Sequence, residues 1–207
     1  MTVQPFGRTL GDTPISLFTL KNQNGLEAQI SNYGGILVSL NSPDREGKTS
    51  DVALGFDSVD GYLAHSRSYF GALIGRYANR IDQAKFNLRG VEYRLDKNDG
   101  PNTLHGGASG FDKRIWAAQA LTEVDLELSY LSKDGEGGFP GNLQVVVNYG
   151  LTEQNELSIR YEATTDKETV VNLTSHAYFN LTTGGSDQTW IMNSRSTRTT
   201  LRRYAKG

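Results

Sequence analysis

Two histidines lie in short polar segments where an imidazole could transfer a proton. His105 is followed by two glycines, and His176 lies among small polar residues after an apolar stretch. Histidine suits proton transfer near neutral pH because its ordinary pKa is about 6.5. Each ring also has a plain structural interpretation, His105 as a ring packed over a tight turn and His176 as a hydrogen-bonded core residue. Residue type alone leaves both interpretations open.

Asn79 and Arg80 are the second pair of polar residues with chemical potential. They end the stretch 75–80, GRYANR, in which glycine and polar side chains exceed what a strand requires. An arginine offers several N–H donors in a fixed fork, so Arg80 could hold sugar hydroxyls; it could equally be a surface cation. The spacing of Gly71 and Gly75 matches neither glycine-rich phosphate motif.

Composition excludes several other classes of protein. The 207-residue chain has no cysteine, which rules out disulfides, zinc ribbons, iron–sulfur centres and thiol nucleophiles. With three histidines, a multi-histidine metal centre would need all of them. Mean hydropathy is −0.48, and the longest apolar runs fall far short of the ~20 residues of a membrane span. The first residues do not resemble a secretory signal, so we expect a cytoplasmic protein.

The elements that must position these residues are predicted to be strands. Apolar residues alternate through 124–130 and 157–161, and 86–95 is predicted to be a hairpin turning at 89–90. The more continuous run 143–149 predicts a strand covered on both faces. A turn or two of helix is expected within 60–66, and Trp116 is expected in the core. The pattern indicates one all-β domain with antiparallel pairing, a sandwich or a barrel.

Three segments taken together identify a family. "GALIGRYANRI" (71–81), "NTLHGGASGFDKRIW" (102–116) and "VNLTSHAYFNL" (171–181) occur in this order. They resemble the aldose 1-epimerase, or galactose mutarotase, family, as do two stretches nearer the N-terminus, 31–48 and 51–63. The resemblance covers about residues 13–181 without a large gap. It implies a large antiparallel β-sandwich, which this chain would hold incompletely at its C-terminal end.

The resemblance also implies a reaction and a set of roles. The family interconverts the α and β anomers of free aldoses such as galactose and glucose by acid/base opening of the ring. His176 then corresponds to the acid that protonates the ring oxygen, and His105 to a second imidazole near that oxygen. Asn79 and Arg80 correspond to hydroxyl-binding residues, and Tyr178 lines the same site. No metal or other cofactor is implied, and the expected partner is a small-molecule aldose rather than nucleic acid or membrane.

Other functions are compatible with the same residues. A β-sandwich that binds sugar without catalysis would keep the same four polar side chains at 79, 80, 105 and 176. A relative that acts on hexose 6-phosphates would share the fold, but it needs added cations near the site, and the body of the chain is acidic. A third alternative is a decayed gene product with no function.

The last residues depart from the family. Residues 192–206 carry five basic side chains and no acid, whereas the other residues include 16 basic and 23 acidic ones. Read one base earlier, with codons chosen within the degeneracy of the genetic code, 192–206 encodes a strand-like peptide similar to the family's segment here. We therefore expect residues 1–185 to be the N-terminal part of the domain and 186–207 to be an out-of-frame tail. The family's glutamate base and a substrate-binding aspartate would follow residue 181, so we expect little activity; a nucleic-acid-binding arm is the alternative interpretation of the tail.

Overall fold

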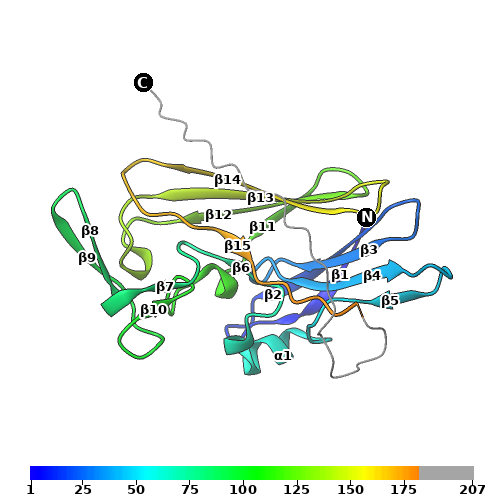
Figure 1. The fold of residues 1–207 in the computed structure, drawn as a ribbon, viewed down its shortest axis with the longest axis horizontal. Coiled ribbons are helices and arrows are strands. Elements are labelled where there is room, and N and C mark those ends of the chain that lie inside the picture. Colours follow the sequence, from blue (N-terminus) through cyan, green and yellow to red (C-terminus); the bar gives the residue numbers. More distant parts are fainter. Residues whose placement is uncertain (182–207) are drawn as a thin grey trace.

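The computed structural model describes residues 1–181, which form two stacked antiparallel sheets (Figure 1). In both sheets the strands are arranged in chain order, so each strand pairs with its neighbours in sequence. The strands of the first sheet are β1 (Thr2–Arg8), β2 (Pro14–Lys21), β3 (Glu27–Ser31), β4 (Leu37–Pro43) and β5 (Thr49–Asp51). Those of the second are β11 (Ala117–Ala120), β12 (Asp125–Ser132), β13 (Leu143–Leu151) and β14 (Leu157–Thr165).

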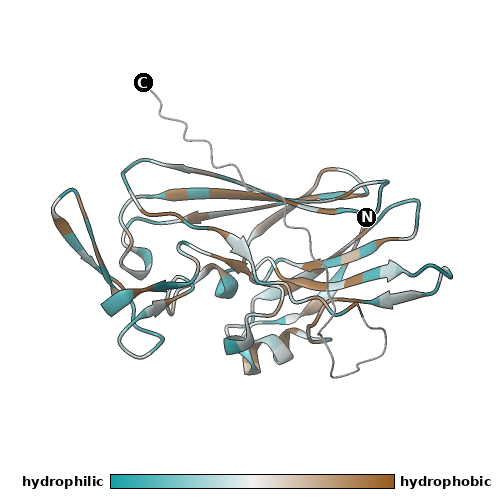
Figure 2. Cartoon of the chain, viewed as in Figure 1, coloured by the Kyte–Doolittle hydropathy of each residue, from teal (hydrophilic) through white to brown (hydrophobic). Residues whose placement is uncertain are grey.

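The main core lies between these sheets because their central strands turn apolar side chains toward the opposite sheet. Leu20, Ala28 and Ile30 of the first sheet are fully buried in one cluster with Val145 and Val147 of the second. Apolar residues accordingly concentrate along the strands of both layers (Figure 2). The two layers are therefore held together mainly by burial of apolar surface.

Short elements fill the space beside the sandwich. Helix α1 (Val59–Ala64) and a 3-10 turn (Ser66–Ser68) lie between β5 and β6 in sequence. The hairpin of β8 (Lys85–Leu88) and β9 (Val91–Arg94) projects away from the two layers (Figure 1). The remaining short elements are β6 (Leu73–Ile74), β7 (Arg80–Ile81), β10 (Thr103–Leu104), β15 (Thr174–Ser175) and the 3-10 turns Asp82–Ala84, Phe111–Lys113 and Glu136–Gly138. Within residues 1–181, no helix is both long enough and apolar enough to span a bilayer.

The sequence-based prediction of an antiparallel all-β sandwich is confirmed, as are the 86–95 hairpin and the short helix near residue 60. Trp116 is a core residue with 1% exposure, as expected. The prediction for 143–149 was wrong on one point. Buried and half-buried residues alternate along β13, so its second face is only partly covered. The predicted out-of-frame tail at 186–207 lies outside the described residues.

Candidate active site

The three segments singled out in the sequence meet in space through two short pairs of strands. β6 pairs antiparallel with β15, which places Leu73 opposite Ser175. β7 pairs antiparallel with β10, which places Arg80 opposite Leu104. The segment 71–81 therefore bridges the other two segments and brings the two candidate histidines to the same place.

His105 is fixed to Asn79 through both its backbone and its ring. The backbone N–H of His105 donates to the Asn79 carbonyl oxygen at 3.0 Å, and the Asn79 backbone N–H donates to His105 Nδ1 at 3.0 Å. Since Nδ1 accepts a hydrogen bond, the neutral imidazole carries its hydrogen on Nε2. The ring thus presents an N–H donor on the side away from Asn79.

His176 is held beside His105. Its backbone N–H donates to the Ala72 carbonyl oxygen at 2.8 Å, and its own carbonyl oxygen accepts from the Gly71 N–H at 3.2 Å. The two imidazole centroids are 5.0 Å apart with nearly perpendicular planes. Both histidines are half-buried. The site therefore pairs two imidazoles edge to face at the boundary between interior and solvent.

Two tyrosines complete an aromatic wall around the histidines. The Tyr69 ring lies 4.8 Å from the His105 ring and 5.6 Å from the His176 ring. The Tyr178 ring lies 5.2 Å from His176 and is 47% exposed. Exposed aromatic faces of this kind suit a ligand that is apolar on one side and hydroxylated on the other.

Arg80 lies at the edge of this cluster and is paired rather than free. Its Nε donates to Asp99 Oδ2 at 2.8 Å, and its Nη1 donates to Asn79 Oδ1 at 3.2 Å. Its side chain is 55% exposed. Of the five predicted site residues, Asn79, Arg80, His105 and His176 converge, and Tyr178 joins them through His176.

The surroundings disfavour a positive charge on His105. Burial is the main cause, followed by the charges of His176, Arg80 and Lys113, and together they lower its pKa from 6.5 to about 4. His105 is consequently a neutral donor and acceptor over the whole physiological range. Neither His105 nor His176 forms an ion pair or hydrogen bond with a carboxylate within residues 1–181.

The backbone around the cluster adopts conformations that most residues avoid. Tyr69, Asn79 and His105 all have positive φ values, between 52° and 65°, and strain of this kind persists only where the surroundings fix it. Gly106 is required because the backbone beside it leaves no room for a side chain. A Cβ at Gly106 would meet the carbonyl oxygen of Gly75, so this glycine permits the close approach of the histidine loop to segment 71–81.

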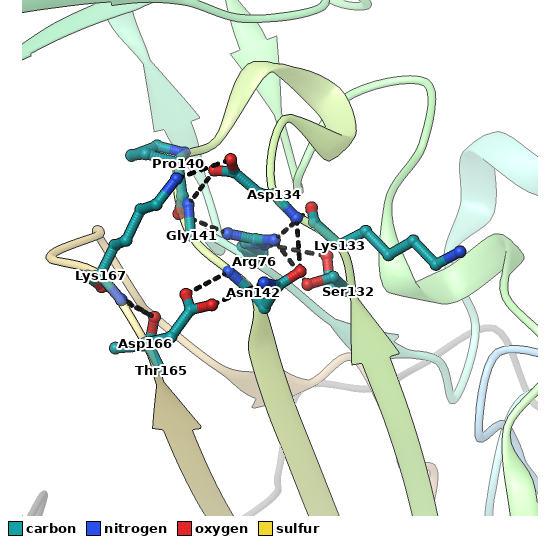
Figure 3. A network of polar contacts seen from close by, with 10 residues as sticks. All are labelled: Arg76, Ser132, Lys133, Asp134, Pro140, Gly141, Asn142, Thr165, Asp166 and Lys167. Atoms are coloured by element: carbon teal, nitrogen blue, oxygen red, sulfur yellow. Dashed lines mark hydrogen bonds and ion pairs between the residues drawn. The ribbon is translucent and has the colours of Figure 1, made fainter.

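Arg76, which sequence reasoning did not single out, anchors the same segment in the interior. Its guanidinium donates to Ser132 Oγ at 2.9 Å and to the carbonyl oxygens of Ser132, Lys133 and Pro140 at 2.8 Å each. Figure 3 shows it at the centre of these acceptors, with Asp134 and Asp166 farther out. Burial lowers the pKa of Arg76. Its single sequence signal is its place three residues before Asn79.

A second charged pair, beside Tyr69, was also missed. Asp112 is 5% exposed, and its Oδ2 accepts from Lys113 Nζ at 2.5 Å, while that ammonium lies 5.3 Å from the centre of the Tyr69 ring. Both residues belong to the quoted segment 102–116, but nothing in the sequence distinguishes them from surface charges. Tyr69 precedes the quoted segments and gave no signal. Within the described residues, no group of three or more potential ligand side chains could hold a metal ion.

Several solved structures share this fold, and two of them show the extent of the similarity. A GalM/aldose epimerase homologue from C. elegans aligns with a TM-score of 0.77 and 33% identity over 80% of this chain and 51% of its own. A galactose 1-epimerase from Lactobacillus acidophilus aligns with a TM-score of 0.75 and 28% identity, over 87% of this chain and 53% of its own. The fold thus defines a protein of the galactose mutarotase-like class.

The sequence comparisons give the particular family. The family model for aldose 1-epimerase matches residues 16–202, and the chain belongs to this family. The galactose mutarotase of Bos taurus is 45% identical over 180 residues, which are 85% of this chain and 52% of that protein. The aldose 1-epimerase of Haemophilus influenzae is 45% identical over 168 residues, 81% of this chain and 48% of its own. The chain thus spans about half the length of these relatives.

Proposed function

We propose that this chain supplies the histidine side of an aldose 1-epimerase site and binds a free aldose such as galactose or glucose. The observation that carries the proposal is the convergence of His105 and His176, 5.0 Å apart, with the paired Asn79 and Arg80 beside them. Membership of the aldose 1-epimerase family supports it.

The geometry suits one half of the ring-opening reaction. When the pyranose opens, the bond between C1 and the ring oxygen breaks, C1 becomes an aldehyde carbon and the ring oxygen gains a proton. We assign that proton to His176, while the Nε2–H of His105 donates a hydrogen bond to the same oxygen. Rotation about the C1–C2 bond and reclosure by the reverse transfers give the other anomer.

The C1 hydroxyl must at the same time lose its proton to a base. Neither histidine contacts a carboxylate within residues 1–181, and Asp99 and Asp112 are already paired with Arg80 and Lys113, so we assign this step to none of them. The resemblance assigns it to a glutamate later in the family's domain than residue 181. We therefore expect the 207-residue polypeptide on its own to bind aldoses but to exchange their anomers slowly.

A neutral sugar fits better than a sugar phosphate. Two of the cations beside the histidines are already paired, Arg80 with Asp99 and Lys113 with Asp112. A phosphate would have to compete with these carboxylates for the cations and would meet their negative charge. We accordingly propose free aldoses, rather than hexose 6-phosphates, as the ligands of this site.

Calorimetry and polarimetry on the purified 207-residue chain test the proposal. We expect galactose to bind, and anomer exchange to stay near the uncatalysed rate. The matched variant His176→Gln should weaken galactose binding, whereas His65→Gln, which changes an exposed histidine stacked on Phe56, should not. Absence of galactose binding would overturn the proposed site, and rapid anomer exchange would overturn the assignment of the base to a later residue.

A further inference from the structure

Asp99, Arg80 and Asn79 form a chain of side-chain hydrogen bonds at the edge of the site. Arg80 lies in the middle, with Nε bonded to Asp99 at 2.8 Å and Nη1 bonded to Asn79 Oδ1 at 3.2 Å. Hydrogen bonds between a guanidinium and a carboxylate are directional and charge-assisted. The orientation of the Arg80 fork therefore depends on where Asp99 is held.

Asp99 is held by the loop that leads to β10 and His105. Its backbone pairs with Asn102 in a tight turn, with N–H to O distances of 3.0 and 3.2 Å. The preceding residue, Asn98, bonds both the N–H and the carbonyl oxygen of Leu104, at 2.6 and 2.8 Å. Leu104 directly precedes His105, so the carboxylate and the imidazole share one short, braced loop.

This chain determines which atoms remain for a ligand. Asn79 Oδ1 accepts from Arg80, which leaves the side-chain NH2 group of Asn79 available as a donor. That group has no hydrogen-bond partner within residues 1–181. Arg80 retains further N–H groups, and His105 carries its hydrogen on Nε2. The exposed groups at this edge are thus hydrogen-bond donors, while the guanidinium charge is balanced by Asp99.

We propose that Asp99 is a specificity-determining residue, which fixes Arg80 as a donor to the hydroxyl oxygens of a neutral aldose and excludes anionic sugars. The inference rests on the proposed function, because it requires that an aldose bind at this cluster. Asp99 acts through Arg80 and Asn79 and so is a positioning residue.

The physical basis is competition for one guanidinium. A sugar carboxylate, as in a uronic acid, would seek the same fork that Asp99 occupies and would be repelled by Asp99 across a few ångströms. A neutral hydroxyl accepts from the remaining N–H groups without displacing Asp99. Discrimination here arises as much from the repulsive group as from the attractive ones.

The variant Asp99→Asn removes the negative charge and keeps the shape of the side chain. We expect its galactose affinity to fall by about tenfold, because a neutral amide oxygen holds the Arg80 Nε–H more weakly than a carboxylate does. The ratio of galacturonate to galactose affinity should rise by about tenfold or more, because the cation is now unbalanced. Asp99→Glu should restore the wild-type ratio. Isothermal calorimetry with both sugars on the full 207-residue chain measures these quantities.

Glu168→Gln is the matched control. Glu168 forms an ion pair of the same kind with Arg89, at 2.9 and 2.8 Å, in an exposed position. Loss of that pair should leave both sugar affinities unchanged. A shift in the galacturonate ratio that is equal in Glu168→Gln and Asp99→Asn would overturn the inference, since net charge alone would then explain it.

A second readout does not depend on sugar. Hydrogen exchange at the Arg80 Nε–H, followed by nuclear magnetic resonance, should be slowed in the wild type and fast in Asp99→Asn. If the wild type binds galactose but Asp99→Asn leaves both the exchange rate and the affinity ratio unchanged, this inference alone fails. If the wild type binds neither sugar, the proposed function fails and the specificity role falls with it.

Discussion

Asn79 and His105 are joined by two hydrogen bonds of 3.0 Å each. The His105 backbone N–H donates to the Asn79 carbonyl oxygen, and the Asn79 backbone N–H donates to the imidazole Nδ1. Both residues have positive φ values. The backbone at both residues and the imidazole ring thus form one arrangement, in which the Asn79 N–H points at the ring. The tautomer of His105 follows from the backbone rather than from a neighbouring side chain.

Protonation of His105 should lower stability in acid. The unfolded chain binds this proton near pH 6.5, whereas the folded chain binds it only near pH 4, mainly because of burial and also because of His176, Arg80 and Lys113. Since the unfolded state binds more protons in this interval, the stabilisation is complete above about pH 6.5 and is lost as the pH falls to about 4.

Urea unfolding of wild type and His105→Gln between pH 4 and pH 8 measures this effect. We expect the difference in unfolding free energy between the two proteins to shrink as the pH falls from 6.5 to 4. Subtraction of the variant removes the contributions of the carboxylates, which titrate in both proteins. A difference that stays constant over this range would show that His105 titrates normally.

Gly106 should tolerate no side chain. In Gly106→Ala the new Cβ would meet the Gly75 carbonyl oxygen at a φ of +85°, so we expect a loss of about 2–4 kcal/mol. Gly25→Ala is the matched control, because Gly25 has a φ of +86° but open space around it. Chemical denaturation should give the control a loss of only about 1 kcal/mol. Equal losses would mean that backbone strain, not close approach, is what requires Gly106.

Arg76 should be essential to the fold although it lies outside the predicted site. Arg76→Met would leave the carbonyl oxygens of Ser132, Lys133 and Pro140 without this donor, and we expect a loss of about 3 kcal/mol or more. Arg89→Met removes an exposed arginine and should leave the thermal midpoint nearly unchanged. Differential scanning fluorimetry compares the two, and similar midpoints would contradict the anchoring role.

Sequence reasoning reached the elements whose signals are local. Alternation predicted β12 and β14, and the turn at 89–90 predicted the β8–β9 hairpin. It was wrong about the second face of β13, because burial of Val146 depends on what lies over that face and not on the strand itself. The strand pairs that close the site, β6–β15 and β7–β10, are two residues long and too short to show a period.

The same contrast between local sequence signals and long-range contacts applies to the candidate site. The segments 71–81, 102–116 and 171–181 contain Asn79, Arg80, His105 and His176. What each of these side chains can do depends on its contacts with residues far away in the sequence. Arg80 was open as a surface cation or a hydroxyl clamp, and the bond to Asp99, 19 residues away, makes it an oriented donor. The fold brings such partners together, so composition and spacing do not predict them.

The ion pair of Asp112 and Lys113 should be strongly coupled. Asp112 is nearly buried, and burial raises the pKa of its carboxyl even though Lys113 acts in the opposite direction. Lys113→Met would leave a buried carboxylate unpaired, which is destabilising, whereas the double variant Asp112→Asn with Lys113→Met removes both charges. We expect the double variant to recover most of the stability lost in Lys113→Met, with a coupling energy of about 1–3 kcal/mol.

The pH dependence of Lys113→Met separates charge from packing. A carboxyl with a raised pKa binds its proton more tightly in the folded state, so the folded protein gains stability as the pH falls through that range. The loss in Lys113→Met should therefore be greater at pH 7 than at pH 4.5, whereas the same lysine substitution made in the Asp112→Asn background should cost the same at both pH values. Urea unfolding at both pH values measures this, with Lys85→Met, an exposed lysine of the β8–β9 hairpin, as control. A loss in Lys113→Met that is the same at both pH values would mean that the lysine stem packs against Tyr69 and that its charge is dispensable.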